Sequence, residues 1–183
     1  MTTHRIFGTV GTDHHPFPRF LEWVGQAGAQ FETSNVVVQR GGTPAISGIS
    51  TVEFMSAVDM EAELLAATAV VCHGGPGTIS AVRKSGHLPL VIPRDPRQGE
   101  HVDDHQMRFC AHTAQQGRII LISSVDQLVE HVGTAIAGRA PKVTETGDSV
   151  AAALRFGTLV SDLVAEKLAP RPFRQRLLFR RIP

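Results

Sequence analysis

Apolar and polar residues alternate along the chain in blocks that predict strands and helices in turn. Short apolar runs bounded by turn residues are typical of buried strands, and they cover residues 5–10, 35–39, 52–55, 69–73, 88–93 and 118–123. Apolar residues at helical spacing predict helices over 16–28, 60–67, 103–117 and 124–138, with a further helix from Pro76. Asp59 and Ser124 are the expected helix caps, and Gly117 is the expected helix stop.

This order of strands and helices predicts an α/β fold. Strands that alternate with helices are joined by right-handed crossovers, which make neighbouring strands parallel. We therefore expect a Rossmann-like, mainly parallel sheet with helices on both faces. The domain should cover residues 1–138, followed by a polar linker at 139–149, a helix at 150–168 and a basic, apolar tail at 169–183.

The tail combines basic and apolar residues. Five arginines are interleaved with Phe173, Leu177, Leu178, Phe179 and Ile182. One interpretation is a solvated chain end. The other is a segment that docks on a partner protein or on an anionic membrane surface.

Composition and charge exclude several classes of protein. Hydrophobic residues make up 42% and charged residues 19% of the 183 residues, which is ordinary for a soluble globular protein. A net charge of +1 argues against nucleic acid as a partner. The two cysteines, Cys72 and Cys110, form no metal-ligand pair and no disulfide framework.

The expected location is the cytoplasm. The first residues lack the apolar region of a signal peptide. The longest apolar run, residues 62–71, is about half of the roughly 20 residues that cross a bilayer. Peripheral attachment to the inner face of the membrane, through a partner or through the basic tail, is the alternative.

Three loops with unusual residues leave strand ends. They are "GTVGTDHH" at 8–15, "HGGPGT" at 73–78 and "RDPRQGEHVDDHQ" at 94–106. In open α/β sheets, ligands bind beyond the carboxyl ends of the strands. The three loops are therefore expected to meet at one site.

The loop at 73–78 suits an anion, although it matches neither a dinucleotide fingerprint nor a Walker A loop. Its glycines let the backbone approach a ligand closely. Pro76 fits the first helical position, and Thr78 can add one hydrogen bond at the positive end of the helix. The alternative is a turn whose glycines serve only packing, but that does not explain His73 at the strand end.

The loop at 8–15 places a second glycine turn and Thr12 ahead of Asp13, His14 and His15. An imidazole in this place can bind a phosphate or act as a general base. The alternative is that Asp13 caps the following helix and both histidines are merely exposed.

The third loop offers His101 and His105, four residues apart, with Asp104 beside His105. On a helix this spacing suits two metal ligands, but the sequence identifies no third ligand. Asp, His and Gln side chains also supply the donors and acceptors that sugar hydroxyls need. We expect sugar recognition here and no bound metal.

The stretch "HGGPGTISAVRKSGHLPLVIPRDPRQGEHVDDHQ" at 73–106 resembles the C-terminal, donor-binding domain of family 28 glycosyltransferases. The stretch "FGTVGTDHHPFPRFLEWV" at 7–24 resembles the opening of the small single-domain members. These are catalytic subunits of two-part N-acetylglucosaminyltransferases and bacterial exopolysaccharide enzymes. The resemblance covers roughly residues 5–135.

The resemblance implies one half of a GT-B glycosyltransferase that uses a UDP-sugar, inverts the anomeric centre and needs no metal or other cofactor. It implies that the donor diphosphate and nucleotide contact His73, Gly74, Gly75, Gly77 and Thr78, and that Thr12 approaches the diphosphate. Sugar hydroxyls would meet His105 and Gln106, with Asp103 and Asp104 alongside. Backbone N–H groups and a helix dipole would stabilise the leaving group.

One position departs from the family pattern. Many members carry a ribose-binding Glu in the helix after the glycines, where this chain has Ala81. Arg83 or Lys84 can compensate, or either can be a solvated helix charge.

The chain length of 183 residues supplies one Rossmann half, so the resemblance implies a separate, membrane-associated partner that brings a lipid-linked glycan acceptor. His14 or His15 is the candidate general base within this chain, unless the partner provides it. Two alternatives are a non-catalytic subunit that binds nucleotide sugars and a metal-dependent hydrolase built on His101 and His105. A sugar-nucleotide epimerase is disfavoured, because such enzymes fuse both halves in one chain.

Overall fold

The structure is a computed structural model that describes residues 3–143. The predicted helix at 150–168, the basic tail at 169–183 and most of the linker at 139–149 lie outside the described residues. The start of the expected linker is included. There, Lys142 forms an antiparallel bridge with His87, and the Val143 N–H donates to the Gly86 carbonyl at 3.1 Å.

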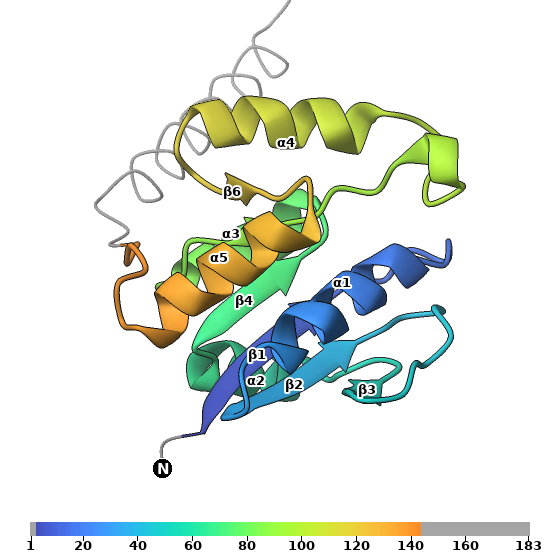
Figure 1. Cartoon of the computed structure of the whole chain (residues 1–183). Coiled ribbons are helices and arrows are strands. Elements are labelled where there is room, and N and C mark those ends of the chain that lie inside the picture. The colour runs from blue at the N-terminus through green and yellow to red at the C-terminus, as the bar shows by residue number, and fades with distance from the viewer. Residues whose placement is uncertain (1–2, 144–183) are drawn as a thin grey trace, which may run out of the picture. The chain divides into compact units, whose positions relative to one another are not determined.

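The described residues form a six-stranded sheet in which every neighbouring pair of strands is parallel. The strands are β1 (His4–Thr9), β2 (Ser34–Gln39), β3 (Ser50–Val52), β4 (Ala69–Cys72), β5 (Leu90–Val91) and β6 (Ile120–Leu121). Their order in the sheet is β3-β2-β1-β4-β5-β6 (Figure 1). The order reverses between β1 and β4, which marks the topological switch point where ligands bind in such sheets.

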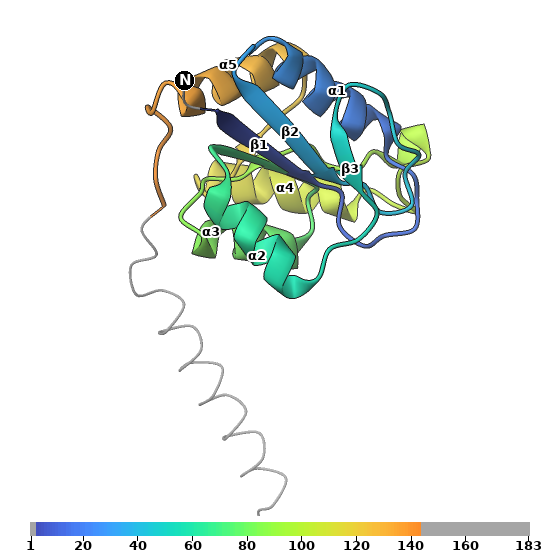
Figure 2. The same ribbon diagram turned by 90° about the horizontal axis from the view of Figure 1, so that it is seen from below.

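Helices cover both faces of the sheet, as the sequence predicts (Figure 2). They are α1 (Pro18–Ala29), α2 (Ala57–Ala66), α3 (Pro76–Lys84), α4 (His105–Gln115) and α5 (Val125–Ile136), with a short 3-10 helix at Pro96–Gln98. α1 and α5 pack against one face, and α2, α3 and α4 pack against the other.

The spacing of apolar residues in the strands and helices explains why the core consists of two apolar clusters, one on each face of the sheet. Ile6 and Phe7 are consecutive in β1 and both fully buried, but they point to opposite faces and join different apolar clusters. In α1 the buried residues Phe20, Leu21 and Val24 recur at helical spacing against the first face. Cys72 is buried in the second cluster.

Two local predictions were wrong at the edge of the sheet. The third strand spans Ser50–Val52 rather than 52–55. α2 is capped by Ser56, whose hydroxyl accepts from the Asp59 N–H at 3.1 Å, so that Asp59 lies in the first turn. The predicted cap and the predicted helix stop are confirmed. Ser124 caps α5, and Gly117 adopts a left-handed φ of 67° just after α4. No helix within residues 3–143 has the length and apolar character needed to span a bilayer.

Candidate functional site

The loops that leave β1 and β4 touch each other at the switch point. The His73 N–H donates to the Thr9 carbonyl at 3.1 Å, which continues the pairing of the two strands by one residue. The His73 ring lies against Gly11 and Gly75, and a Cβ at either glycine would overlap that ring. Gly11 also has a φ of 75°, which favours glycine. Both glycines are therefore required by the position of the imidazole.

The His73 imidazole is neutral at physiological pH. It is only 8% exposed, and its Nδ1 has no hydrogen-bond partner among the described residues. Burial, followed by the nearby positive charge of Arg94, lowers the pKa of His73 to about 4. The ring can therefore donate or accept a hydrogen bond at this site, but it carries no positive charge of its own.

The turn at 73–78 leads directly into α3. Gly75 occupies the cap position and Pro76 the first helical position, as predicted. The next N–H groups, those of Gly77 and Thr78, have no acceptors within a helix and point out of its start. A Cβ at Gly74 would overlap the side chains of Cys110 and Gln106, whereas a Cβ at Gly77 meets nothing within 4 Å. Packing thus explains Gly74 but not Gly77.

Gln106 joins the loops that follow β4 and β5. Its Oε1 accepts from the Gly74 N–H at 3.3 Å and from the Arg94 N–H at 2.8 Å. Because two backbone N–H groups require an acceptor, they fix which end of the amide faces the loops. The NH₂ end of Gln106 is directed away from those two N–H groups.

Arg94 is a central residue of the site that the sequence analysis missed. Its side chain is fully buried, and it donates to the carbonyls of His15 at 2.8 Å, Glu100 at 3.0 Å and Val10 at 3.1 Å. Its guanidinium also lies 4.7 Å from the centre of the Phe17 ring. Arg94 therefore ties the loop after β1 to the loop after β5.

An ion pair between Arg19 and the buried Glu100 reinforces this connection. Glu100 is 2% exposed and accepts from Arg19 Nε at 2.9 Å and from Arg19 NH2 at 2.7 Å. Its other bond is with the Asp95 N–H, which donates to Oε2 at 2.8 Å. The start of α1 is thereby fixed against the loop after β5.

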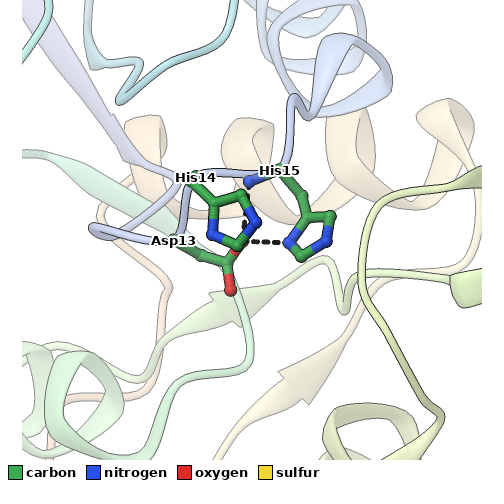
Figure 3. Close-up of side chains that lie close together, drawn as sticks. All are labelled: Asp13, His14 and His15. Atoms are coloured by element: carbon green, nitrogen blue, oxygen red, sulfur yellow. Dashed lines mark hydrogen bonds and ion pairs between the residues drawn. The ribbon is translucent and has the colours of Figure 1, made fainter.

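Asp13, His14 and His15 lie together on the loop after β1 (Figure 3). Asp13 Oδ1 lies 2.8 Å from the His15 backbone nitrogen and 2.6 Å from His15 Nδ1. Burial opposes ionisation of Asp13, but the bonds from His15 and the Arg94 charge outweigh it and lower the pKa of the carboxyl. Asp13 does not cap α1, which starts at Pro18 with Phe17 at the cap position and no side-chain cap.

The loop before α4 continues this row of polar groups. His101 Nε2 lies 3.8 Å from Asp13 Oδ2, and His101 Nδ1 lies 3.6 Å from Asp103 Oδ1. Asp103 Oδ2 is 2.9 Å from Nδ1 of the exposed His105. Asp104 instead pairs with Arg108 at 3.0 Å. Imidazoles and carboxylates thus alternate along the edge at which the strands end.

His101 and His105 do not form the helical pair of the alternative metal-site interpretation. α4 begins at His105, so His101 lies in the preceding loop and does not share a helix face with it. Among residues 3–143, the three side chains of Asp13, His14 and His15 can hold a metal, since one ligand atom of each lies within 4.8 Å of the others. The 2.6 Å hydrogen bond between Asp13 and His15 already uses two of the polar atoms of this group.

The remaining predicted residues are placed as follows. Thr12 is exposed beside Gly11, and Thr78 is half-buried in the first turn of α3. Ala81 packs against the second apolar cluster. Arg83 donates to the carbonyl of Arg118, just before the start of β6. It therefore lies toward the end of the sheet where the strands begin, away from the three loops.

A cavity of about 420 Å³ also lies at the end of the sheet where the strands begin. Its lining includes Ala69, Leu90 and Ile120, at the starts of three strands. None of the predicted site residues lines it. The cavity and the loops at the carboxyl ends of the strands are therefore two separate regions.

Comparison with known proteins identifies relatives of this fold. Residues 12–140 match the family model of the glycosyltransferase family 28 C-terminal domain. No curated protein matches the chain. Among solved structures, the glycotransferase of kitacinnamycin has 19% identity and a TM-score of 0.55, over 90% of this chain and 40% of its own.

Two further structures are similar. A putative UDP-N-acetylglucosamine 2-epimerase from Listeria monocytogenes has 16% identity and a TM-score of 0.59, over 89% of this chain and 46% of its own. CalG4, the calicheamicin glycosyltransferase, has 14% identity and a TM-score of 0.52, over 92% of this chain and 45% of its own. This chain spans less than half the length of these proteins. The likeness shows the fold, which is one half of a GT-B architecture.

Proposed function

The chain belongs to the family of glycosyltransferase family 28 C-terminal domains, and from this premise we propose that it binds a UDP-sugar and transfers the sugar as a hexosyltransferase subunit. The observation that carries the proposal is the junction of three loops at the switch point. His73 packs on Gly11, and Gln106 bonds to the backbone of Gly74 and Arg94. Residues from all three loops can therefore contact one ligand.

The donor diphosphate binds at the start of α3 in this proposal. The N–H groups of Gly77 and Thr78 supply donors, and the helix dipole supplies positive potential. The open space at Gly77 supports close approach of the diphosphate to the backbone. Thr12 and the neutral His73 add polar contacts to the phosphates. These donors stabilise the charge of the leaving group, so that the reaction needs no metal.

The sugar of the donor contacts the start of α4. The amide NH₂ of Gln106 and the exposed imidazole of His105 meet its hydroxyls. Asp103 orients His105 through the 2.9 Å pair, and Asp104 lies alongside. Polar side chains of this kind provide both donors and acceptors at short range.

The reaction is direct displacement with inversion. The acceptor hydroxyl loses its proton to an imidazole, His14 or His15, while its oxygen bonds to the anomeric carbon. The bond between that carbon and the diphosphate oxygen breaks at the same centre. The nucleoside diphosphate leaves with the electron pair.

The acceptor is a lipid-linked glycan held by a membrane-associated partner protein, in polysaccharide synthesis on the cytoplasmic side of the membrane. The described domain is one half of a GT-B architecture. In the proposed heteromeric enzyme, the partner protein is the second half. The basic tail at 169–183 is a candidate for attachment to the partner or to the bilayer.

A second candidate is a non-catalytic subunit that binds nucleotide sugars. It is favoured by Ala81, which packs in an apolar cluster where many family members carry a ribose-binding Glu. The metal-dependent hydrolase has less support, because His101 and His105 do not share a helix.

Two measurements test the proposal. Calorimetry with UDP-N-acetylglucosamine, UDP-glucose and UDP-galactose should detect binding of at least one donor, and absence of binding to every nucleotide sugar would refute both candidates. Transfer assays with and without the partner then separate them. A catalytic subunit loses transfer when its own imidazoles are replaced, whereas an accessory subunit does not.

A further inference from the structure

The Asp13 carboxylate lies between two imidazoles that belong to different loops. Its Oδ1 is 2.6 Å from Nδ1 of His15, and its Oδ2 is 3.8 Å from Nε2 of His101. Asp13 thus faces one imidazole from its own loop and one from the loop that precedes α4. An ionised carboxylate only accepts hydrogen bonds, so the imidazole nitrogen that bonds to it must carry a proton.

The hydrogen bonds of His101 also indicate which of its ring nitrogens carries the proton. The Asp103 N–H donates to His101 Nδ1 at 3.4 Å, so Nδ1 of that ring is an acceptor. The proton of a neutral His101 then resides on Nε2, which is the atom directed at Asp13. Both imidazoles therefore direct a proton toward Asp13, but only the His15 proton lies within hydrogen-bond distance of the carboxylate.

Three hydrogen bonds fix the position of His15, whereas His14 is exposed. The His15 N–H donates to Asp13 at 2.8 Å, its carbonyl accepts from Arg94 at 2.8 Å, and its ring bonds to Asp13. His14 is exposed, and its ring stacks on that of His15 with 4.1 Å between the ring centres. A catalytic imidazole needs a fixed ring orientation and a fixed tautomer, which only His15 has among these two.

We propose that His15 is the general base and that Asp13 is a positioning residue, which holds the proton on His15 Nδ1 and leaves Nε2 free to accept the proton of the acceptor hydroxyl. The role of His15 as general base rests on the proposed glycosyl transfer. Its structural content, the tautomer of His15, is independent of any substrate. Asp13 touches no reacting atom and acts through His15 alone.

The tautomer is read by nitrogen NMR of the full chain at about pH 8.5, where free imidazole is neutral. In the wild type, His15 Nδ1 should give the signal of a protonated ring nitrogen and Nε2 that of an unprotonated one. Asp13→Asn keeps the size of the side chain but can also donate, so the Nε2–H tautomer should appear. The exposed Asp126, on α5, provides the control Asp126→Asn, which should leave the His15 signals unchanged.

Kinetics with the reconstituted enzyme provides the second readout. Asp13→Asn should lower kcat about a hundredfold with little change in the KM of the donor, within the usual range of general-base catalysis. A wild-type His15 with its proton on Nε2, or an Asp13→Asn variant with an unchanged tautomer and kcat, would overturn the inference. If the wild type transfers no sugar from any donor, the proposed function fails, while the tautomer measurement still decides the role of Asp13.

Discussion

The buried guanidinium of Arg94 donates to the carbonyl of His15 at 2.8 Å and thereby joins a residue after β5 to the loop after β1. The same side chain reaches the carbonyl of Val10 at 3.1 Å, close to the end of β1. One side chain thus holds the first loop at two of its carbonyls. The orientation of His15 depends on a residue 79 positions away in sequence.

Replacement of Arg94 by methionine should destabilise the domain by about 3 kcal/mol, because three carbonyls, two of them in buried bonds, lose their donor. Urea unfolding of the purified chain measures the effect. Arg108→Met is the matched control, since Arg108 is exposed and, within residues 3–143, pairs only with the exposed Asp104. That change should cost no more than about 0.5 kcal/mol. Equal losses in the two variants would show that the Arg94 bonds contribute little.

Replacement of Gly11 by alanine should displace His73, because a Cβ there overlaps the imidazole and the φ of 75° is unfavourable for alanine. The combined cost should be about 2–4 kcal/mol, and donor binding should weaken. Gly117→Ala isolates the backbone effect, since Gly117 has a φ of 67° but open space around its Cβ position. That control should cost about 1 kcal/mol and leave donor affinity unchanged. Unfolding curves and calorimetry separate the two outcomes.

The low pKa of His73 predicts a loss of stability in acid. Its pKa of about 4 in the folded state lies below the ordinary histidine pKa of 6.5, so the unfolded chain binds the proton more readily. The unfolding free energy should therefore fall as pH drops from about 6.5 to about 4, by roughly 3 kcal/mol in total, and change no further through this group below that range. His73→Gln removes the titration and should flatten this part of the curve. Because burial also lowers the pKa of His87, the test is the difference between the two curves, and parallel curves would contradict the assignment.

The fold was predictable where apolar residues recur at the spacing of a strand or a helix. Apolar runs indicated β1 and β4, and helical spacing indicated α1. The boundaries of α2 were not predictable, because Ser56 and Asp59 are both residues that cap helices and lie three positions apart. In the structure the Ser56 hydroxyl donates to the Asp59 carboxylate at 2.7 Å while accepting from its N–H, so both residues serve the same cap.

The candidate site was only partly predictable. The His73 turn and Gln106 follow strand ends, and the structure joins them through Gly74. Arg94 has no local signal, because its acceptors come from positions 6 to 84 residues away. The four-residue spacing of His101 and His105 likewise does not show whether the two residues share a helix. The His105 N–H bonds to Asp103 at 3.0 Å, so that the helix begins only after His101.

Gly77→Asp tests whether an anion binds at the start of α3. A carboxylate in the first turn of a helix interacts favourably with the helix dipole, and glycine is a poor helix former, so stability should rise by about 0.5 kcal/mol. No neighbouring atom lies within 4 Å of the Cβ position, so the side chain fits without strain.

The same carboxylate would compete with a diphosphate for the N–H groups of Gly77 and Thr78, and UDP-sugar affinity should fall at least about tenfold. Ser80→Asp is the matched control, because Ser80 is exposed on the same helix, beyond its first turn. Calorimetry should find its affinity within about twofold of the wild type, a difference of less than about 0.5 kcal/mol. A Gly77→Asp protein that is stable and binds the donor as tightly as the wild type would place the diphosphate elsewhere, because the added charge would then lie far from it.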